Sequence, residues 1–383
     1  MRVGDWRIQE HGDTVEVSAE VDGFRLWYRV PKAYKVSRAG DPFLASAIIP
    51  AMAKGEELEV DPALPVSPRF LKNLSRIQDI HHCWNPALKK VPVRASTAPA
   101  EPLNEGAFSF FSGGLDSLYT FFKRQGDISH VVSLHGFDFF RAEEEHLKAV
   151  ARNASFVGGF GKTLIPVETN HYPFDYRNGL SRVLTQGSTL ASVAHLLGFS
   201  RAYVPSSISY VHLVPLGSHP LLDPLYSNES VDVIHDGAEA RRADKLVTIA
   251  ARESALANLV VCIDEMNFNC GKCQKCLRTM IVLEAIEAKA ALFPALPPAG
   301  TLRRLYRETY QFFIDENLDL AVRKGHKKLA GALKAVRRRY ERRRLIKDAD
   351  RILLRGLIRR TYRKIRKEPV RLIDWIETTP PKD

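Results

Sequence analysis

The sequence predicts an α/β protein built on a doubly wound, mostly parallel sheet. Between residues 106 and 290, short apolar runs typical of strands alternate with segments of helical spacing. A region with a β-hairpin precedes this part, and a basic helical region follows it. We therefore expect three parts: an N-terminal region with its linker over residues 1–104, an α/β domain over 105–295, and a helical extension over 296–383.

The hairpin is predicted over residues 14–31. Apolar and polar residues alternate on both sides of Asp22 and Gly23, a pair typical of a two-residue type I′ turn. In that register the apolar side chains of both strands share one face: Val15, Val17, Ala19, Val21, Phe24, Leu26, Tyr28 and Val30. A proline-rich stretch follows at 60–70, and 91–106 has the composition of a linker. Between them, His81 and His82 beside Cys83 are expected to be loop residues and not metal ligands.

The central part contains five expected strands and five expected helices in strict alternation. The strands are predicted at 106–111, 130–138, 163–169, 201–206 and 258–263, and the helices at 115–126, 143–154, 188–198, 243–254 and 276–291. Such alternation is typical of crossover units joining parallel strands.

A glycine loop, residues 112–117, joins the first of these strands to the first helix. In a doubly wound sheet, ligands bind beyond the carboxyl ends of the strands. Two adjacent glycines allow backbone N–H groups to converge on an anion, and a helix N-terminus adds partial positive charge. We expect the whole loop to bind nucleotide phosphates, with Asp116 facing Mg²⁺ or fixing the loop from within. Its residues are Ser112, Gly113, Gly114, Leu115, Asp116 and Ser117.

The loop matches neither G-x-x-x-x-G-K-[ST] nor G-x-G-x-x-G, which excludes a Walker loop and a dinucleotide fingerprint. The pattern S-G-G-x-D-S resembles the PP-loop of the ATP pyrophosphatases, which release pyrophosphate while adenylating a substrate oxygen. An ordinary glycine-rich turn is the alternative, and the position between a strand and a helix favours the phosphate site.

Four of the five cysteines lie within 15 residues, as Cys262, Cys270, Cys273 and Cys276. This C-x7-C-x2-C-x2-C spacing lets four thiolates converge on one ion, and four thiolates leave zinc no open position, which is typical of a structural site. An iron–sulfur cluster also accepts four cysteines and is the less favoured alternative.

Taken together, the loop and the cysteines resemble the 7-cyano-7-deazaguanine synthases of queuosine and deazapurine biosynthesis. The resemblance covers roughly residues 105 to 295 and also includes Phe137, Asp138, Arg141, Glu145 and Arg278. It implies an adenine nucleotide alpha hydrolase-like fold and ATP whose adenine packs around Leu134, His135 and Phe137. It also implies that a 7-carboxy-7-deazaguanine-like acid is activated as its adenylate and then joined to ammonia or another amine.

The synthases usually carry a Gly-Tyr-Pro-Asp-Cys-Arg-like stretch that shapes the deazapurine pocket. This chain has no such stretch at the corresponding place, where residues 216–237 instead offer Ser218, His219, Asp223 and Asp236. The first three, with Asp138 and Arg141, are the candidate substrate residues. Since the tyrosine, cysteine and arginine are missing, the resemblance does not fix the base.

The formal net charge of +12 is concentrated in the last part of the chain. From residue 301 onward there are 25 Lys and Arg against 11 Asp and Glu, whereas the first 300 residues carry 31 against 33. Apolar residues Leu345, Ile346, Ile352, Leu353, Leu357 and Ile358 form a stripe that we expect to pack on the body, leaving the cations outward. A basic face suits phosphate backbones or an acidic protein surface.

Two functions of different classes follow. The first is an ATP-dependent ligase that forms an amide with ammonia, an amine or a protein acceptor, in a specialised pathway such as bacterial antiviral defence. The second is a nucleic-acid-binding component of a tRNA- or DNA-modification system that binds ATP as a regulatory ligand. We expect a cytoplasmic protein that uses ATP, Mg²⁺ and structural Zn²⁺, without a membrane partner. The partners that this interpretation allows include a second copy of the chain, as a homodimer.

Overall fold

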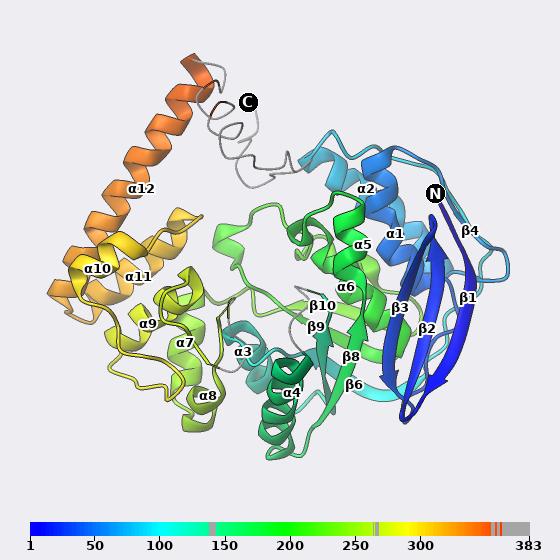
Figure 1. The fold of residues 1–383 in the computed structure, drawn as a ribbon, viewed down its shortest axis with the longest axis horizontal. Coiled ribbons are helices and arrows are strands. Elements are labelled where there is room, and N and C mark those ends of the chain that lie inside the picture. Colours follow the sequence, from blue (N-terminus) through cyan, green and yellow to red (C-terminus); the bar gives the residue numbers. More distant parts are fainter. Residues whose placement is uncertain (138–142, 263, 265–267, 354–356, 358–360, 362–383) are drawn as a thin grey trace.

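The computed structural model describes residues 1–137, 143–262, 264, 268–353, 357 and 361. Within these residues the strands form one sheet in the order β10-β9-β6-β7-β8-β3-β2-β1-β4-β5 (Figure 1). They are β1 (Arg2–His11), β2 (Thr14–Val21), β3 (Phe24–Pro31), β4 (Leu58–Val60), β5 (Val93–Arg94), β6 (Asn104–Phe110), β7 (His130–His135), β8 (Thr163–Thr169), β9 (Phe199–Pro205) and β10 (Asp232–Asp236). Pairing is parallel from β10 to β8 and from β1 to β5, and antiparallel from β8 to β1. The predicted α/β class with a mostly parallel sheet is confirmed.

Helices cover both faces of the sheet. Successive residues of a strand point to opposite faces, and on each face they pack with helices in a separate apolar cluster. In β9, Ala202 and Val204 belong to one cluster, whereas Tyr203 belongs to the other. The first cluster includes side chains of α1 (Asp41–Lys54), α2 (Pro68–Trp84) and α6 (Arg182–Leu197). The second includes those of α3 (Leu115–Lys123), α7 (Arg242–Ala250), α8 (Glu253–Asn258), α9 (Gln274–Ala285), α10 (Ala299–Leu305), α11 (Gln311–Arg323) and α12 (Lys327–Leu353). Phe174 of α5 (His171–Arg177) and Tyr226 of the 3₁₀ turn η2 (Asp223–Tyr226) also belong to the first cluster, and Val157 of α4 (Glu143–Gly158) belongs to the second. A further 3₁₀ turn is η1 (Tyr210–His212).

The predicted hairpin is formed by β2 and β3. Val21 pairs with Phe24, and both turn residues have positive φ, 53° at Asp22 and 70° at Gly23. This is the type I′ geometry that the sequence predicted. Seven of the eight apolar side chains are buried, and Phe24 packs half-buried against the same core.

The parallel part of the sheet reverses its direction of growth at β6. Along the chain the five strands β6 to β10 take the spatial order β8-β7-β6-β9-β10, so that β6 lies between β7 and β9. The carboxyl ends of β6 and β9 therefore meet at the point where the order reverses. Such switch points are where open α/β sheets bind their ligands.

One expected strand was wrong. Residues 258–263 were expected to form the fifth strand, but within the described residues of this range no ladder forms. The Val260 N–H donates to the carbonyl of Gly113 over 3.0 Å, and the Val261 N–H donates to Asn269 Oδ1 over 2.8 Å. Leu259 and Val261 of this run are buried in the same apolar cluster as the side chains of α9, which accounts for its composition. The fifth parallel strand is β10. The sequence analysis predicted no strand there and treated residues 216–237 only as the source of candidate substrate residues.

The N-terminal part also contains two helices that the sequence analysis did not predict. Helix α1 is buried almost throughout, so its sequence lacks the polar face that marks an amphipathic helix. It packs along α6. The Tyr28 hydroxyl contacts Ser46 Oγ at 2.8 Å and donates to Ser192 Oγ over 3.0 Å. The core of residues 1–104 is therefore continuous with that of the central part.

Helix α12 extends away from the body (Figure 1). Its first half packs on α10 and α11, whereas the apolar stripe in its second half is exposed. Leu345, Ile346, Ile352, Leu353 and Leu357 are 60–77% exposed, and Ile358 lies outside the described residues. The expectation that this stripe packs on the body was wrong, because the helix runs past the elements that it would have covered. Among the described helices, none combines the length and apolar character needed to cross a bilayer.

His81 and His82 lie on α2 and not in the expected loop, and His81 is fully buried. Within the described residues neither ring nitrogen of His81 has a hydrogen-bond partner, and burial lowers its pKa to about 3. The unfolded chain, with a pKa of about 6.5, then binds the proton first, so stability is lost as pH falls from about 6.5 toward 3. Between pH 7 and pH 5, urea unfolding of the wild type should lose about 2 kcal/mol more than that of His81→Leu. If the unfolding free energies of the two proteins fell equally between pH 7 and pH 5, the depressed pKa of His81 would be refuted.

Candidate functional site

The glycine loop lies between β6 and α3, at the carboxyl end of the central strand. Gly113 has a φ of +73°, and a Cβ there would lie 2.8 Å from Asn153 Oδ1. Both the backbone conformation and the close approach require glycine at this position. Helix α3 begins at Leu115 directly after Gly114, so the orphan N–H groups of its first turn face the loop region. The predicted strand–loop–helix arrangement is present.

The two serines of the loop hold its shape. Ser117 Oγ donates to the Gly114 carbonyl over 2.9 Å and accepts from the Ser112 N–H over 3.3 Å. The two hydroxyl oxygens are 3.4 Å apart, and Ser117 is buried while Ser112 is exposed. Ser117 therefore acts within the loop, and Ser112 is the serine open to a ligand.

Asp116 is ion-paired with two cations from α7. Arg242 contacts Asp116 Oδ2, and Lys245 Nζ lies 3.5 Å from Asp116 Oδ1. Burial alone would raise the pKa of Asp116, but the two cations outweigh it and hold the pKa below its usual value. The carboxylate is therefore charged and positioned by its partners.

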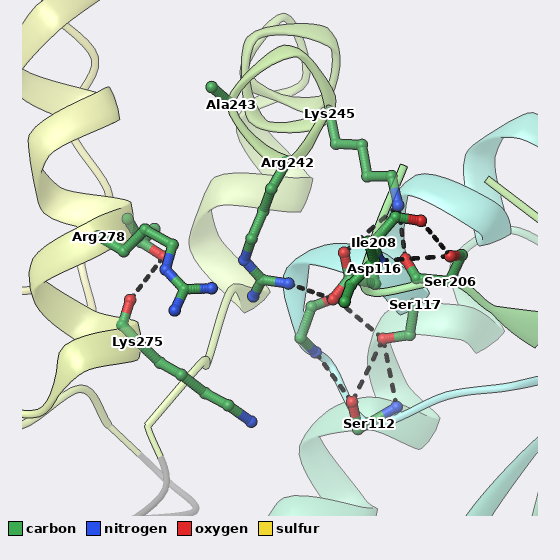
Figure 2. A network of polar contacts seen from close by, with 12 residues as sticks. Ser112, Asp116, Ser117, Ser206, Ile208, Arg242, Ala243, Lys245, Lys275 and Arg278 are labelled. Carbon is green, nitrogen blue, oxygen red and sulfur yellow. Dashed lines mark hydrogen bonds and ion pairs between the residues drawn. The ribbon is translucent and has the colours of Figure 1, made fainter. Parts of the chain in front are cut away.

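Further cations lie close by on α9. Figure 2 shows Arg242 and Lys245 reaching from α7 toward Asp116, with Lys275 and Arg278 on the other side of Arg242. Arg278 is held by Glu308 through two hydrogen bonds of 2.7 and 2.6 Å and lies over the ring of Phe313. The charges of Arg242, Lys245 and Lys275 act on Asp116, and we call these three residues the cationic group.

The sequence analysis missed Arg242 and Lys245, which lie 126 and 129 residues from Asp116. One signal was available. Cations are unfavourable at a helix N-terminus, where the dipole favours anions, and α7 begins with Arg242 after Arg241. Such a local conflict suggests that the residues serve another purpose.

The candidate substrate residues join the loop through a chain of polar contacts. Lys245 Nζ donates to the carbonyl of Ser206 at the end of β9 over 2.5 Å. Ser206 Oγ lies 2.8 Å from His235 Nε2, and His235 Nδ1 lies 2.7 Å from Asp223 Oδ2. Ser218 donates to the same Asp223 oxygen over 2.8 Å. Ser206, Ser218, His219 and His235 line one hollow with Gln186, Pro205, Ser207, Ile208, Leu213, Val214, Leu216 and Pro220.

Two other candidates nearby have defined partners. His219 is buried beside the Trp84 ring, and burial with the neighbouring His235 lowers its pKa to about 4. Asp236, at the end of β10, accepts from Arg124 over 2.7 and 2.9 Å and lies 3.1 Å from Lys123. His219 is therefore neutral near pH 7, and Asp236 serves to join β10 to α3.

The residues expected near the adenine follow β7. His135 stacks on His146 with ring centroids 3.9 Å apart, and with Glu168 these side chains could hold a metal ion. Leu134 and Phe137 pack half-buried on the core, and Arg182 lies over the Phe137 ring. Asp138 and Arg141 lie outside the described residues.

The four cysteines converge. All four sulfurs lie within 4.8 Å of one another, and the pairs Cys262–Cys273 and Cys270–Cys276 are each 3.9 Å apart. Four sulfurs placed tetrahedrally at about 2.3 Å from zinc lie about 3.8 Å apart, so the cluster fits one zinc ion. In a four-iron cluster each thiolate binds a different iron, which requires wider separations. Cys83 is exposed and does not belong to the group.

The cysteine cluster is connected to the glycine loop on both sides. Before Cys262, the Val260 N–H donates to the Gly113 carbonyl, and after it the cluster caps α9, which carries Lys275. An ion at the cysteines would therefore fix two of the segments that border the loop. A scan of protein-family models, a search of curated proteins and a search of solved structures each found no match for this chain.

Proposed function

We propose that the chain uses ATP to activate a carboxylate as its adenylate, releasing pyrophosphate, and then joins the acyl group to an amine. The observation that carries this proposal is the glycine loop at the switch point of the sheet, bordered by the cationic group. Backbone N–H groups, a helix N-terminus and three cations are the donors that a triphosphate requires. The buried Nε–H of Arg242 has no acceptor among the described residues, which suits an anionic partner.

The acid is proposed from the sequence resemblance as a 7-carboxy-7-deazaguanine-like carboxylate. Lys245 contacts both Asp116 of the loop and the Ser206 carbonyl, which supports placing the acid next to the loop on this side. Asp116 would hold Mg²⁺, which neutralises the charge on the leaving pyrophosphate. The cysteine cluster would hold a structural zinc ion that supports the loop.

The test is product analysis with the full chain, Mg²⁺·ATP and 7-carboxy-7-deazaguanine, with and without an amine such as ammonia. We expect AMP and pyrophosphate in equal amounts only when the acid is present, and an amide by mass spectrometry when the amine is added. ADP with phosphate would contradict the proposal, since adenylation breaks the bond between the α- and β-phosphates. Benzoate in place of the acid is the control for specificity.

A second candidate is a nucleic-acid-binding component in which ATP is a regulatory ligand. It is favoured by α12, which exposes Arg338, Arg342, Arg343 and Arg344 to solvent. Phosphate backbones bind such a surface without base contacts. ATP binding without any acid-dependent AMP formation would favour this candidate over the ligase.

A further inference from the structure

Three side chains beside the loop form a hydrogen-bonded line that the proposed adenylation does not use. Ser206 directly follows β9, His235 lies near the end of β10, and Asp223 begins η2. Asp223 Oδ2 lies 2.7 Å from His235 Nδ1, and His235 Nε2 lies 2.8 Å from Ser206 Oγ. A serine, a base and an orienting carboxylate within these distances are the arrangement that activates a nucleophilic serine.

The partners of Asp223 fix the roles along this line. Besides His235, the carboxylate accepts from Ser218 Oγ over 2.8 Å and from the His219 N–H over 3.3 Å, and its residue is 1% exposed. A carboxylate at Nδ1 requires that nitrogen to carry the proton. In the neutral ring Nε2 is then an acceptor, directed at the Ser206 hydroxyl.

The Ser206 hydroxyl has one proton and two acceptors for it. Its oxygen lies 2.6 Å from the Ile208 carbonyl oxygen and 2.8 Å from His235 Nε2, and it accepts from the Ile208 N–H over 3.3 Å. The two contacts with Ile208 close a local turn, and the contact with His235 is additional to them. Ser206 and His235 also line the hollow, so the pair borders a space and is not enclosed in the core.

We propose that Ser206 is a nucleophile that accepts an acyl group, with His235 as its general base and Asp223 as the positioning residue. Ser206 Oγ bonds to the acyl carbon, the bond from that carbon to its leaving oxygen breaks, and the hydroxyl proton moves to His235 Nε2. The donor class is an activated acyl compound, a mixed anhydride or an ester. An amine then attacks the ester, the C–Oγ bond breaks, Ser206 recovers a proton from His235, and one proton passes to solvent.

This inference rests on the proposed function in one respect: the adenylate made at the glycine loop would be the natural acyl donor, and AMP would leave as an anion. Lys245, which contacts Asp116 and the Ser206 carbonyl, connects the two positions. The nucleophile itself does not depend on ATP. It can therefore be tested without the nucleotide.

The test treats the full chain with p-nitrophenyl acetate, a small activated ester suited to a serine that is 2% exposed. We expect a burst of about one p-nitrophenolate per chain, with one acetyl group on the peptide that contains Ser206. Ser206→Ala should abolish the burst, and His235→Gln should slow it by about 100-fold. Ser75→Ala is the matched control and should react as the wild type does, since Ser75 is exposed on α2 and lies outside the hollow.

Acetylation at other residues only, or at Ser206 with a rate indifferent to His235→Gln, overturns the inference. Peptide mapping of the wild type decides the site even where a variant fails to fold. The result is separate from the product analysis above. AMP formation without acetyl-Ser206 removes only the nucleophile, whereas acetyl-Ser206 without AMP formation removes only the adenylation.

Discussion

Asp116→Asn is expected to lower acid-dependent pyrophosphate release by about 100-fold or more. The carboxylate is the anion against which Arg242 and Lys245 are held, and it is the group proposed to bind Mg²⁺. The amide keeps the shape of the side chain but removes its charge, so both the metal and the positions of the two cations are affected. Initial rates of pyrophosphate release at saturating ATP measure the change.

The same substitution tests what Asp116 contributes to stability. Lys245 is 1% exposed and would be left beside Arg242 without its carboxylate, although its bond to the Ser206 carbonyl remains. Breaking a buried ion pair in this way costs about 3 kcal/mol, so the variant should melt at a lower temperature and still be folded at 20 °C by circular dichroism.

Asp127→Asn is the matched control for this experiment. Asp127 follows the other end of α3, and its carboxylate lies 3.4 Å from Arg124 at the surface. The variant should keep wild-type pyrophosphate release and lose less than about 1 kcal/mol of stability. Wild-type release in Asp116→Asn would remove the glycine loop as the phosphate site.

The features that the sequence predicted well depend on neighbouring residues. The glycine loop, the hairpin turn at Asp22 and Gly23, and the close spacing of the three cysteines from Cys270 to Cys276 each fit within a few residues. Local backbone geometry and ligand spacing decide such features, so sequence alone carries them.

The features that it missed depend on where distant segments meet. The apolar run at 258–263 has the composition of a strand, but the hydrogen bonds from Val260 to Gly113 and from Val261 to Asn269 show that its backbone is paired elsewhere. Strand β10 contains only two apolar residues, Val233 and Ile234, and gave too weak a pattern. The ion pair of Asp116 with Arg242 joins α3 to α7. The hydrogen bonds from Asp223 through His235 to Ser206 join η2, β10 and the end of β9. Composition does not determine such contacts between distant segments.

Local sequence patterns also did not predict that the strands of residues 1–104 extend the central sheet. Strand β3 pairs with β8 through only Tyr28–Thr169 and Arg29–Glu168. Asn170 extends this contact toward the start of β3, accepting from the Trp27 N–H and donating to the Arg25 carbonyl. A short pairing supported by the side chains of Asn170 and Thr169 leaves no periodic signal in the sequence.

Purified protein is expected to contain about one zinc ion per chain, and Cys276→Ser is expected to lose it. Cys276 is fully buried, and its Sγ lies 3.9 Å from that of Cys270, so its thiolate would be one of the four zinc ligands. A structural zinc site contributes about 10 kcal/mol or more, comparable with the whole stability of an ordinary domain. The variant should therefore lose the order of the segment from Val260 to α9, seen as faster hydrogen exchange there.

Loss of this segment should also lower ATP turnover, because the Val260 N–H supports the Gly113 carbonyl and α9 carries Lys275. Elemental analysis, hydrogen exchange and pyrophosphate release should therefore change together in Cys276→Ser. Cys83→Ser is the matched control, since Cys83 is exposed and outside the cluster, and it should keep its zinc and its activity. Iron with visible absorbance in the wild type, or full zinc content in Cys276→Ser, would refute the four-cysteine zinc assignment.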